Sequence, residues 1–372
     1  MHFKQCQVGQ TTGQPDLLTD NFNQTVWIMI RVLIVDDSPT LRFLIRNILT
    51  SDAEIEVAGE AKNGEEAFLL CKKLNPDVIT MDIHMPKVDG YQAIQRIMAE
   101  YPRPIIILTS TESDIRLGIT YRGLEAGALM VYGKPHGLPG EDPEADDLVR
   151  VVKAMSDVKV VRRRLHGNKP IVHPMRRQAG KSVSQGLKII AIGSSTGGPP
   201  ALKTILEELP ATYPLPIVVV QHISKGFTEG LVKWLDSVIS LHVKLATNGE
   251  PLVPGTVYVA PDDIHFKVTR DLKVKLNHED IDSPHCPSVN VLFHSVAEQF
   301  HHSAVGVLLT GMGRDGAEGL LAIKSRGGFT IAQDQSSSIV FGMPKEAIVI
   351  GAACEVLPLD HIGVKLREIG IA

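Results

Sequence analysis

Short runs of apolar residues recur along the first half of the chain, with amphipathic stretches such as 63–74 between them. The runs are rich in β-branched residues and are nearly continuous, which is typical of strands buried on both faces of a parallel sheet. The pattern therefore predicts five strand–helix repeats that form one doubly wound parallel sheet. The predicted strands cover residues 31–35, 55–59, 77–81, 104–108 and 128–132.

The same rhythm of apolar runs resumes at Leu187 and continues towards the C-terminus. A chain of 372 residues is long for a single domain, so two α/β domains are the natural expectation. We place the first domain at 29–158 and the second at 187–372. The predicted strands of the second domain lie within 188–193, 216–222, 257–261, 304–311 and 329–334.

Two further segments lack this rhythm. Residues 1–28 are polar and aperiodic, and Met29 opens a strand-like run. We therefore expect Met29 to be the biological start and 1–28 to be a disordered or non-native extension; a short functional tail is the alternative. Residues 159–186 hold eight Lys or Arg and no acids. We interpret them as a basic, solvated linker rather than a nucleic-acid contact, because no helix-turn-helix or interleaved aromatic residues accompany them.

Composition narrows the class of protein. A net charge of −4 gives no general attraction to nucleic acid or to anionic membranes. The four cysteines lie far apart without a Cys-x-x-Cys pair, which favours free thiols over a disulfide or zinc site. No apolar run is long enough to cross a bilayer, and the N-terminus lacks a secretory pattern. We therefore expect a cytoplasmic protein without membrane insertion.

Charged and hydroxyl side chains follow the predicted strands of the first domain. Asp36 and Asp37 follow the first strand, Asp82 the third, Thr109 the fourth and Lys134 the fifth. Ligands of such sheets bind at the carboxyl ends of the strands, where these residues should meet. Three crowded carboxylates need a cation, and oxygen ligands suit Mg²⁺. Any one of the acids could simply cap a helix, but five strand-end positions together favour a phosphoryl site.

The segments VDDSPTLR, MDIHMPKVDG, LTS and GKP resemble the signature segments of the response-regulator receiver family, over about residues 30–158. That resemblance implies a flavodoxin-like domain phosphorylated on an aspartate. By resemblance Asp82 is the phosphoacceptor, the three carboxylates together hold Mg²⁺, and Thr109 and Lys134 contact the phosphoryl oxygens. By the same resemblance the phosphodonor would be a histidine kinase.

In the second domain, the strand at 188–193 runs directly into the sequence GSSTGG (193–198). Ser195 there fits G-x-S-x-G, the strand–turn–helix bend that exposes a nucleophilic serine above a sheet. A helix beginning near Pro199 would add main-chain N–H groups for a developing oxyanion. The glycines do not fit the common nucleotide-binding motifs. Taken alone, the motif could also be a simple tight turn.

A serine nucleophile needs a base and an acid that orients the base. The chain has 14 histidines, so composition does not identify the base. His222 directly follows the strand run IVVVQ (217–221), and Asp315 lies just beyond the strand at 304–311, so both should reach the edge that carries Ser195. The order Ser, His, Asp differs from that of α/β-hydrolases, so the chemistry can match where the fold does not.

The segments IGSSTGGPPAL, VVQHISKGFT, HCPSVNVLFHSVA, GVLLTGMGRDGAEG and IVFGMPKEA resemble the catalytic domain of chemotaxis protein-glutamate methylesterases, over about residues 187–360. A receiver domain joined N-terminally to this domain is that family's architecture. The resemblance implies a Rossmann-like three-layer fold and these roles: nucleophile Ser195, general base His222, orienting carboxylate Asp315, and main-chain oxyanion donors Thr196 and Met312.

The resemblance further implies hydrolysis of glutamyl methyl esters on methyl-accepting chemoreceptors, with release of methanol and no cofactor for the ester hydrolysis. Deamidation of receptor glutamines at the same site would be expected too. Ser194 departs from the family pattern, in which a small alanine is more usual at that position. Two alternatives stay open: an output module that binds without catalysis, and an esterase for a substrate other than receptors.

Overall fold

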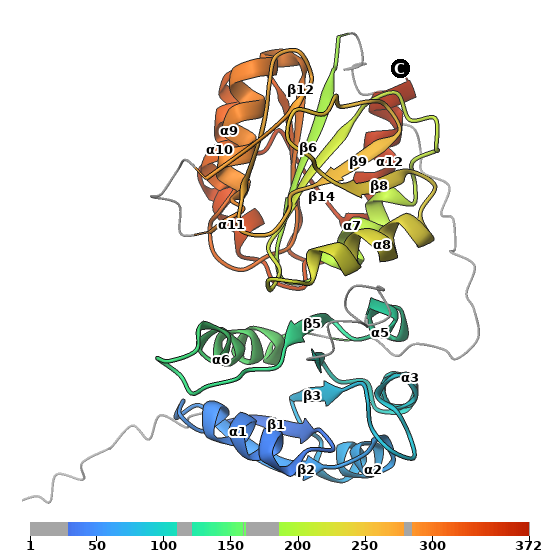
Figure 1. The fold of residues 1–372 in the computed structure, drawn as a ribbon, viewed down its shortest axis with the longest axis vertical. Helices are drawn as coiled ribbons and strands as arrows, with labels where there is room; N and C mark the ends of the chain where they lie inside the picture. Colours follow the sequence, from blue (N-terminus) through green and yellow to red (C-terminus); the bar gives the residue numbers. More distant parts are fainter. Residues whose placement is uncertain (1–28, 110–120, 159, 161–185, 279–284, 372) are drawn as a thin grey trace, which may run out of the picture.

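The computed structural model contains two α/β units stacked along its long axis (Figure 1). The N-terminal unit runs from β1 to α6 and the C-terminal unit from β6 to α12. The structure describes residues 29–109, 121–158, 160, 186–278 and 285–371. The predicted extension 1–28 and nearly all of the predicted linker 159–186 lie outside these residues. Within the described ranges, no helix has the length and apolar character needed to cross a membrane.

The N-terminal unit is built on five parallel strands in the order β2-β1-β3-β4-β5. This is the strand order of flavodoxin-like folds, so the predicted fold class is confirmed. Each predicted strand is present, with ends shifted by one or two residues. The elements are β1 (Ile30–Val35), α1 (Pro39–Leu49), β2 (Ile55–Ala61), α2 (Gly64–Leu74), β3 (Val78–Asp82), α3 (Gly90–Glu100), β4 (Ile105–Thr109), α5 (Arg122–Ala126), β5 (Met130–Gly133) and α6 (Pro143–Ser156).

Helices α1 and α6 cover one face of this sheet, and α2, α3 and α5 cover the other. Three of them begin at a capping side chain: Ser38, Asn63 and Asp89 each accept a main-chain N–H from the first turn of α1, α2 and α3. Two of these caps lie in the loops that follow β1 and β3. The caps therefore fix the loops beside the acidic residues at the strand ends.

The C-terminal unit is built on seven parallel strands in the order β14-β13-β12-β6-β7-β9-β8, with β6 at the centre. Helices α7, α8 and α12 pack on one face and α9, α10 and α11 on the other, which confirms the predicted three layers. The elements are β6 (Ile189–Ser194), α7 (Gly198–Leu206), β7 (Ile217–Gln221), α8 (Thr228–Val238), β8 (His242–Leu245), β9 (Thr256–Val259), β10 (His265–Val268), β11 (Val274–Asn277), α9 (Val289–Phe300), η2 (His301–Ser303), β12 (Ala304–Leu308), α10 (Ala317–Ser325), β13 (Phe329–Gln333), α11 (Met343–Val349), β14 (Glu355–Leu357) and α12 (Leu359–Ile371).

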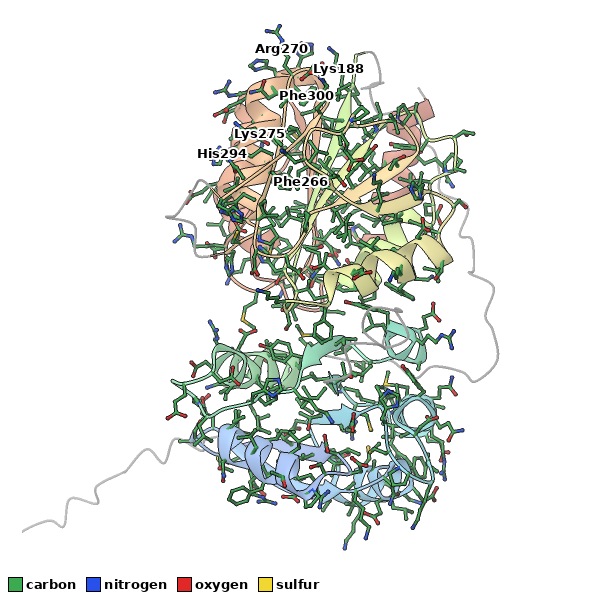
Figure 2. All side chains as sticks on the ribbon, viewed as in Figure 1. Lys188, Phe266, Arg270, Lys275, His294 and Phe300 are labelled. Carbon is green, nitrogen blue, oxygen red and sulfur yellow. The ribbon has the colours of Figure 1, made fainter. Side chains whose placement is uncertain are left out.

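Four of these strands were not predicted. β8 and β14 are the short edge strands of the sheet, and each has exposed or half-exposed positions instead of a continuous apolar run. β10 and β11 form an antiparallel hairpin outside the main sheet, with lysines among their few residues. Phe266 of β10 and Phe300 of α9, both labelled in Figure 2, are buried in the core cluster that joins the hairpin to α9.

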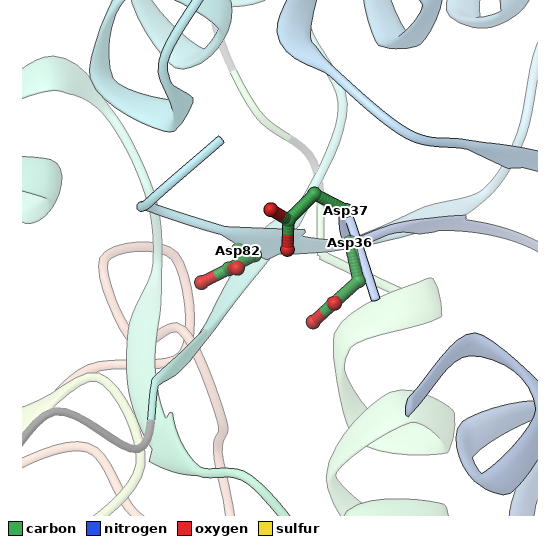
Figure 3. Close-up of side chains that lie close together, drawn as sticks. All are labelled: Asp36, Asp37 and Asp82. Carbon is green, nitrogen blue, oxygen red and sulfur yellow. The ribbon is translucent and has the colours of Figure 1, made fainter. Parts of the chain in front are cut away.

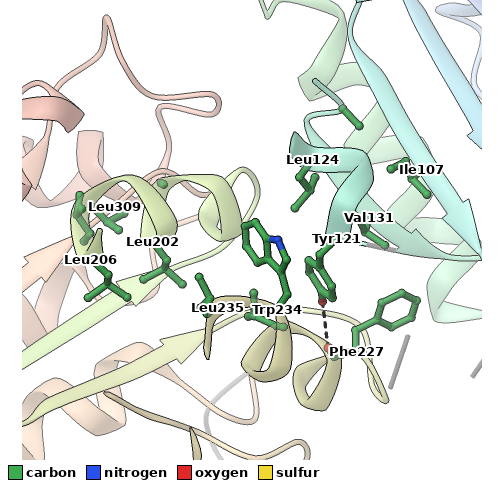
Figure 4. Close-up of a cluster of buried hydrophobic side chains, with 14 of the residues drawn as sticks. Ile107, Tyr121, Leu124, Val131, Leu202, Leu206, Phe227, Trp234, Leu235 and Leu309 are labelled. Atoms are coloured by element: carbon green, nitrogen blue, oxygen red, sulfur yellow. Dashed lines mark hydrogen bonds between the residues drawn. The ribbon is translucent and has the colours of Figure 1, made fainter. Parts of the chain in front are cut away.

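The two units meet in an apolar contact around Tyr121 and Trp234 (Figure 4). Tyr121, which precedes α5, is fully buried and stacks on Trp234 of α8 with ring centroids 5.5 Å apart. Its hydroxyl donates to the carbonyl oxygen of Phe227 at 3.0 Å. The indole N–H of Trp234 in turn donates to Glu125 at 3.2 Å. Since Trp234 is also almost completely buried, separating the units would expose two large aromatic side chains.

Candidate active site

The turn after the central strand β6 carries two adjacent serines. Ser194 ends the strand and is fully buried, whereas Ser195 is partly exposed at the start of the turn into α7. Gly197 has a φ of +77°, a conformation that residues with a side chain rarely adopt. A Cβ atom on Gly198 would collide with the side chain of Gln221. The predicted strand–turn–helix bend is therefore present, and glycine is required at both positions.

His222 lies beside this turn because β7 is paired with β6. The main-chain N–H of His222 donates to the carbonyl oxygen of Ser194 at 2.9 Å. Its ring atom Nε2 lies 2.9 Å from Oδ2 of Asp315, which is in the loop between β12 and α10. The orientation departs from hydrogen-bond geometry, so the contact is an electrostatic one. The strand-end reasoning thus correctly predicted that His222 and Asp315 lie together.

Asp315 is held as a carboxylate at the N-terminus of α9. Its oxygens accept the hydroxyl of Ser288 at 2.9 Å and the main-chain N–H groups of Val289 and Asn290 at 2.7 and 3.0 Å. Burial alone would raise the pKa of Asp315, but His222 and the two main-chain donors outweigh it and lower that pKa to about 2. Asp315 is therefore a buried, permanent negative charge beside the His222 ring at neutral pH.

A cavity of about 650 Å³ opens in front of these residues. The C-terminal unit contributes Ser195 and His222, together with the candidate oxyanion residues Thr196 and Met312. The opposite wall belongs to the N-terminal unit, through residues of β5 and α6. These residues of the N-terminal unit are Met130, Tyr132, Asp147, Arg150 and Val151. The cavity is thus lined by both units, and the N-terminal one forms the wall that faces Ser195.

The N-terminal unit has a second cluster, at the carboxyl ends of its own strands (Figure 3). Carboxylate oxygens of Asp36, Asp37 and Asp82 lie within 4.8 Å of one another. Lys134 Nζ lies 2.8 Å from Asp36 Oδ2 and 2.9 Å from Asp82 Oδ2. Thr109, at the end of the neighbouring strand β4, is buried close by in the same sheet edge. The five residues predicted at strand ends are therefore at one edge.

Burial and charge act in opposite directions on this cluster. Burial raises the pKa of Asp82, only partly offset by Lys134, and Asp36 raises it further. Burial would lower the pKa of Lys134, but contact with Asp36 and Asp82 outweighs it and raises that pKa. Three carboxylates against one ammonium group leave a net charge of −2. The cluster consequently has the oxygen ligands and the charge deficit that suit a divalent cation.

Comparisons with known proteins identify both units. Residues 190–366 match the family model described as CheB methylesterase, and residues 32–138 match the response regulator receiver domain. A protein-glutamate methylesterase/protein-glutamine glutaminase of Nitrosospira multiformis is 45% identical over 92% of this chain and 97% of its own length. The chain belongs to the CheB methylesterase family.

Other relatives have the same extent. A protein-glutamate methylesterase/protein-glutamine glutaminase 1 of Syntrophus aciditrophicus is 45% identical over 90% of this chain and 96% of its own length. Among solved structures, the CheB methylesterase catalytic domain of Thermotoga maritima is 43% identical and covers 49% of this chain and 98% of its own, with a TM-score of 0.48. The response regulator domain of Thermotoga maritima CheB is 36% identical and covers 35% of this chain and 98% of its own, with a TM-score of 0.31.

In this member of the CheB methylesterase family, four residues at the site were not singled out from the sequence. His285 stacks on His222 with ring centroids 4.5 Å apart. Two causes lower the pKa of His285: first the partial burial of its ring, and second the adjacent His222. The residue as a whole is still exposed to solvent. Ser288, Thr310 and Gln221 hold the surrounding loops by hydrogen bonds. In the sequence, these four residues stood out only because they lie within the segments that resemble the CheB methylesterase family.

Replacing Asp315 with asparagine should lower kcat by about 10³–10⁴-fold, since an amide cannot keep the imidazole oriented and stabilise its charged form.

The same substitution should also change the free energy of unfolding. The pKa of Asp315 is about 2 against an ordinary 3.8, so its ionised form contributes about 2 kcal/mol above pH 4, and this contribution is lost as the pH falls towards 2. Urea unfolding should therefore still show wild type to be the more stable at pH 4, and the difference from Asp315→Asn should shrink as the pH falls towards 2. A difference that disappears above pH 5 would contradict the assigned pKa.

Proposed function

We propose that this chain is a phosphorylation-controlled hydrolase that removes methyl esters from glutamate residues of chemoreceptors and releases methanol. The observation that carries the proposal is the arrangement of Ser195, His222 and a buried, ionised Asp315 at one sheet edge, in a cavity walled by the receiver unit. The names of the relatives, which describe methylesterase and glutaminase activities, support the same reaction class. Deamidation of receptor glutamines would use the same residues.

The proposed reaction is acyl transfer. Ser195 Oγ attacks the ester carbonyl carbon while His222 takes its proton, and the C–O bond to methanol breaks as His222 returns that proton. Since Nε2 of His222 faces Asp315, Nδ1 is the ring nitrogen left to serve Ser195. Water then attacks the acyl-serine with His222 again as base, and the receptor glutamate leaves. Main-chain N–H groups of Thr196 and Met312, both at the cavity, would stabilise the oxyanion, each typically contributing ~10²–10³-fold in rate.

For the receiver unit, we propose Asp82 as the phosphoacceptor, with Thr109 and Lys134 as contacts for the phosphoryl oxygens. The net charge of −2 and the all-oxygen donor set of Asp36, Asp37 and Asp82 fit Mg²⁺, which would supply charge neutralisation during phosphoryl transfer. A chemotaxis histidine kinase would be the phosphodonor, and the cytoplasm the compartment. We also propose the domain division 29–158 and 187–372.

The direct test follows radiolabelled methanol released from chemoreceptor membranes that carry labelled glutamyl methyl esters. The full chain with Mg²⁺ and acetyl phosphate should release the label, and membranes from cells without receptors should release none. A chain that hydrolyses small methyl esters but leaves receptor esters intact would indicate an esterase with a different substrate. A chain with neither activity would contradict the proposed chemistry.

A fragment of residues 187–372 should hydrolyse receptor esters faster than the unphosphorylated full chain and should not respond to acetyl phosphate. The fragment keeps all seven strands of its sheet, and removing β5 and α6 opens one wall of the cavity. An uncovered site needs no conformational shift, so the competent fraction approaches one. Rates of methanol release by the two proteins are the measurement. A folded fragment that is slower than the resting full chain would show that the receiver unit also helps to build the site.

A further inference from the structure

The side chain of Gln221 links the two turns that carry the proposed nucleophile and base. Its Nε2 donates to the carbonyl oxygen of Ser195 at 2.8 Å and to that of His222 at 2.7 Å. Its Oε1 accepts the hydroxyl of Ser194 at 2.6 Å. Gln221 is only 4% exposed and Ser194 is 0% exposed, so these bonds are not shared with bulk water. The carboxamide is therefore fully engaged within the turn region.

The direction of every hydrogen bond in this network follows from its partners. Main-chain carbonyl oxygens only accept, so the NH₂ group of Gln221 must face those of Ser195 and His222. The amide oxygen must then face Ser194, whose hydroxyl has to donate. The two carbonyl oxygens thus select the one amide orientation in which the NH₂ group reaches both turns, and the Ser194 hydroxyl adapts to it by donating to the amide oxygen.

The hydrogen bonds of Gln221 lie just beyond the point where main-chain pairing between β6 and β7 ends. Ser194 and Gln221 are the last register partners of β6 and β7, and the N–H of His222 makes the last main-chain bond between them, to Ser194. Beyond that point the chains turn away, Ser195 towards α7 and His222 into its loop. Among the described residues, the carboxamide of Gln221 hydrogen-bonds to the carbonyl oxygens of both Ser195 and His222. It therefore connects the two chains one residue beyond the end of the strands, at the two residues whose relative position matters for the proposed reaction.

We propose that Gln221 is a positioning residue that fixes Ser195 and His222 relative to each other for proton transfer. The proposal rests on the proposed function, in which these two side chains exchange a proton. A displacement of about 1 Å between reacting groups can cost about 10²-fold in rate. Loss of the carboxamide should therefore lower kcat and leave the affinity for the substrate nearly unchanged.

The test compares variants of the full chain with Mg²⁺ and acetyl phosphate present. Gln221→Met keeps the length of the side chain without its hydrogen bonds, and should lower kcat by about 10–100-fold with KM within about twofold. Thr330→Val is the matched control: Thr330 of β13 also makes a buried bond to a main-chain carbonyl, that of Ala352, but not at this site. It should lower the melting temperature with kcat unchanged. Wild-type kcat in Gln221→Met, or an equal loss of kcat in Thr330→Val, would overturn the proposal.

Gln221→Glu adds a pH readout. A protonated carboxyl can donate to one carbonyl, whereas the carboxylate donates to neither and is repelled by both. The ratio of variant to wild-type kcat should therefore fall as the pH rises and the introduced carboxyl ionises. The titratable groups around this turn, His222, His285 and Asp315, are present in both proteins, so the pH profile of wild type is the reference for the ratio. A ratio that stays constant with pH would contradict positioning through the carboxamide.

One further measurement separates this proposal from the proposed function. A fluorophosphonate reacts with an activated serine whether or not the chain accepts chemoreceptors as substrate. If wild type is labelled on Ser195 but releases no methanol, the substrate assignment fails and the positioning role stays testable. In that case Gln221→Met should be labelled about 10–100-fold more slowly, whereas Thr330→Val should be labelled at the wild-type rate. Equal rates for wild type and Gln221→Met would overturn the positioning role alone.

Discussion

Replacing Ser195 with alanine should abolish methanol release from receptor membranes, with a loss of about 10⁴–10⁶-fold in kcat. Ser195 is the partly exposed serine of the turn and lines the cavity with His222, whereas the neighbouring Ser194 is buried and is not expected to take over. The measurement is the initial rate of methanol release by wild type and variant at equal concentration. Melting temperatures should agree closely, because the removed hydroxyl is not part of a core.

Ser194→Ala is the matched control for this prediction, since it removes the neighbouring hydroxyl. Ser194 is fully buried, and its hydroxyl donates to Gln221, so it is not placed to act as a nucleophile. Gln221 would keep its two bonds to main-chain carbonyls, so most of the activity should remain. The reverse result, an inactive Ser194→Ala and an active Ser195→Ala, would overturn the assignment of the nucleophile.

Replacing Asp82 with asparagine should prevent phosphorylation by acetyl phosphate and remove its stimulation of the esterase. An amide oxygen cannot form the acyl phosphate, and Asp36 and Asp37 are the proposed ligands of the cation. Lys134, which contacts Asp82, directly follows β5, and residues of β5 wall the cavity in front of Ser195. A phosphoryl group on Asp82 would therefore act on the strand that covers the active site. Shifting such an equilibrium from 1:99 to 99:1 takes about 5.5 kcal/mol.

Two controls sharpen this second prediction. Asp52→Asn removes an acid that is paired with Lys153 and is not part of the acidic cluster, and should leave labelling and stimulation unchanged. Removing Mg²⁺ with a chelator should abolish labelling of wild type while leaving the basal esterase rate as it was. Undiminished labelling of Asp82→Asn would mean that the phosphoacceptor lies elsewhere.

Local sequence patterns predicted the strands with buried faces but not the short ones. The five strands of the first sheet and the central strands of the second were evident because buried parallel strands are continuous apolar runs. β8, β14 and the β10–β11 hairpin have four residues or fewer, with lysines or exposed positions, so their pairing depends on the neighbours that the rest of the fold provides. The contact of Tyr121 with Trp234 likewise depends on how the two units meet.

At the site, strand-end reasoning brought His222 and Asp315 together correctly, because carboxyl ends of parallel strands share one edge. It missed Gln221, whose importance follows from its register with Ser194. Register and the spatial order β12-β6-β7 are set by packing of the whole sheet and not by the sequence near Gln221. His285 was missed for a similar reason, as its stacking on His222 joins segments far apart in the chain.

The most direct test of a serine site covered by a receiver is the rate at which a fluorophosphonate labels the full chain, with the adduct mapped by peptide mass spectrometry. Acetyl phosphate with Mg²⁺ should accelerate labelling of wild type, place the adduct on Ser195, and have no effect on Asp82→Asn. Labelling of another residue, or a rate on Ser195 that is the same with and without the phosphodonor, would contradict a nucleophile controlled through Asp82.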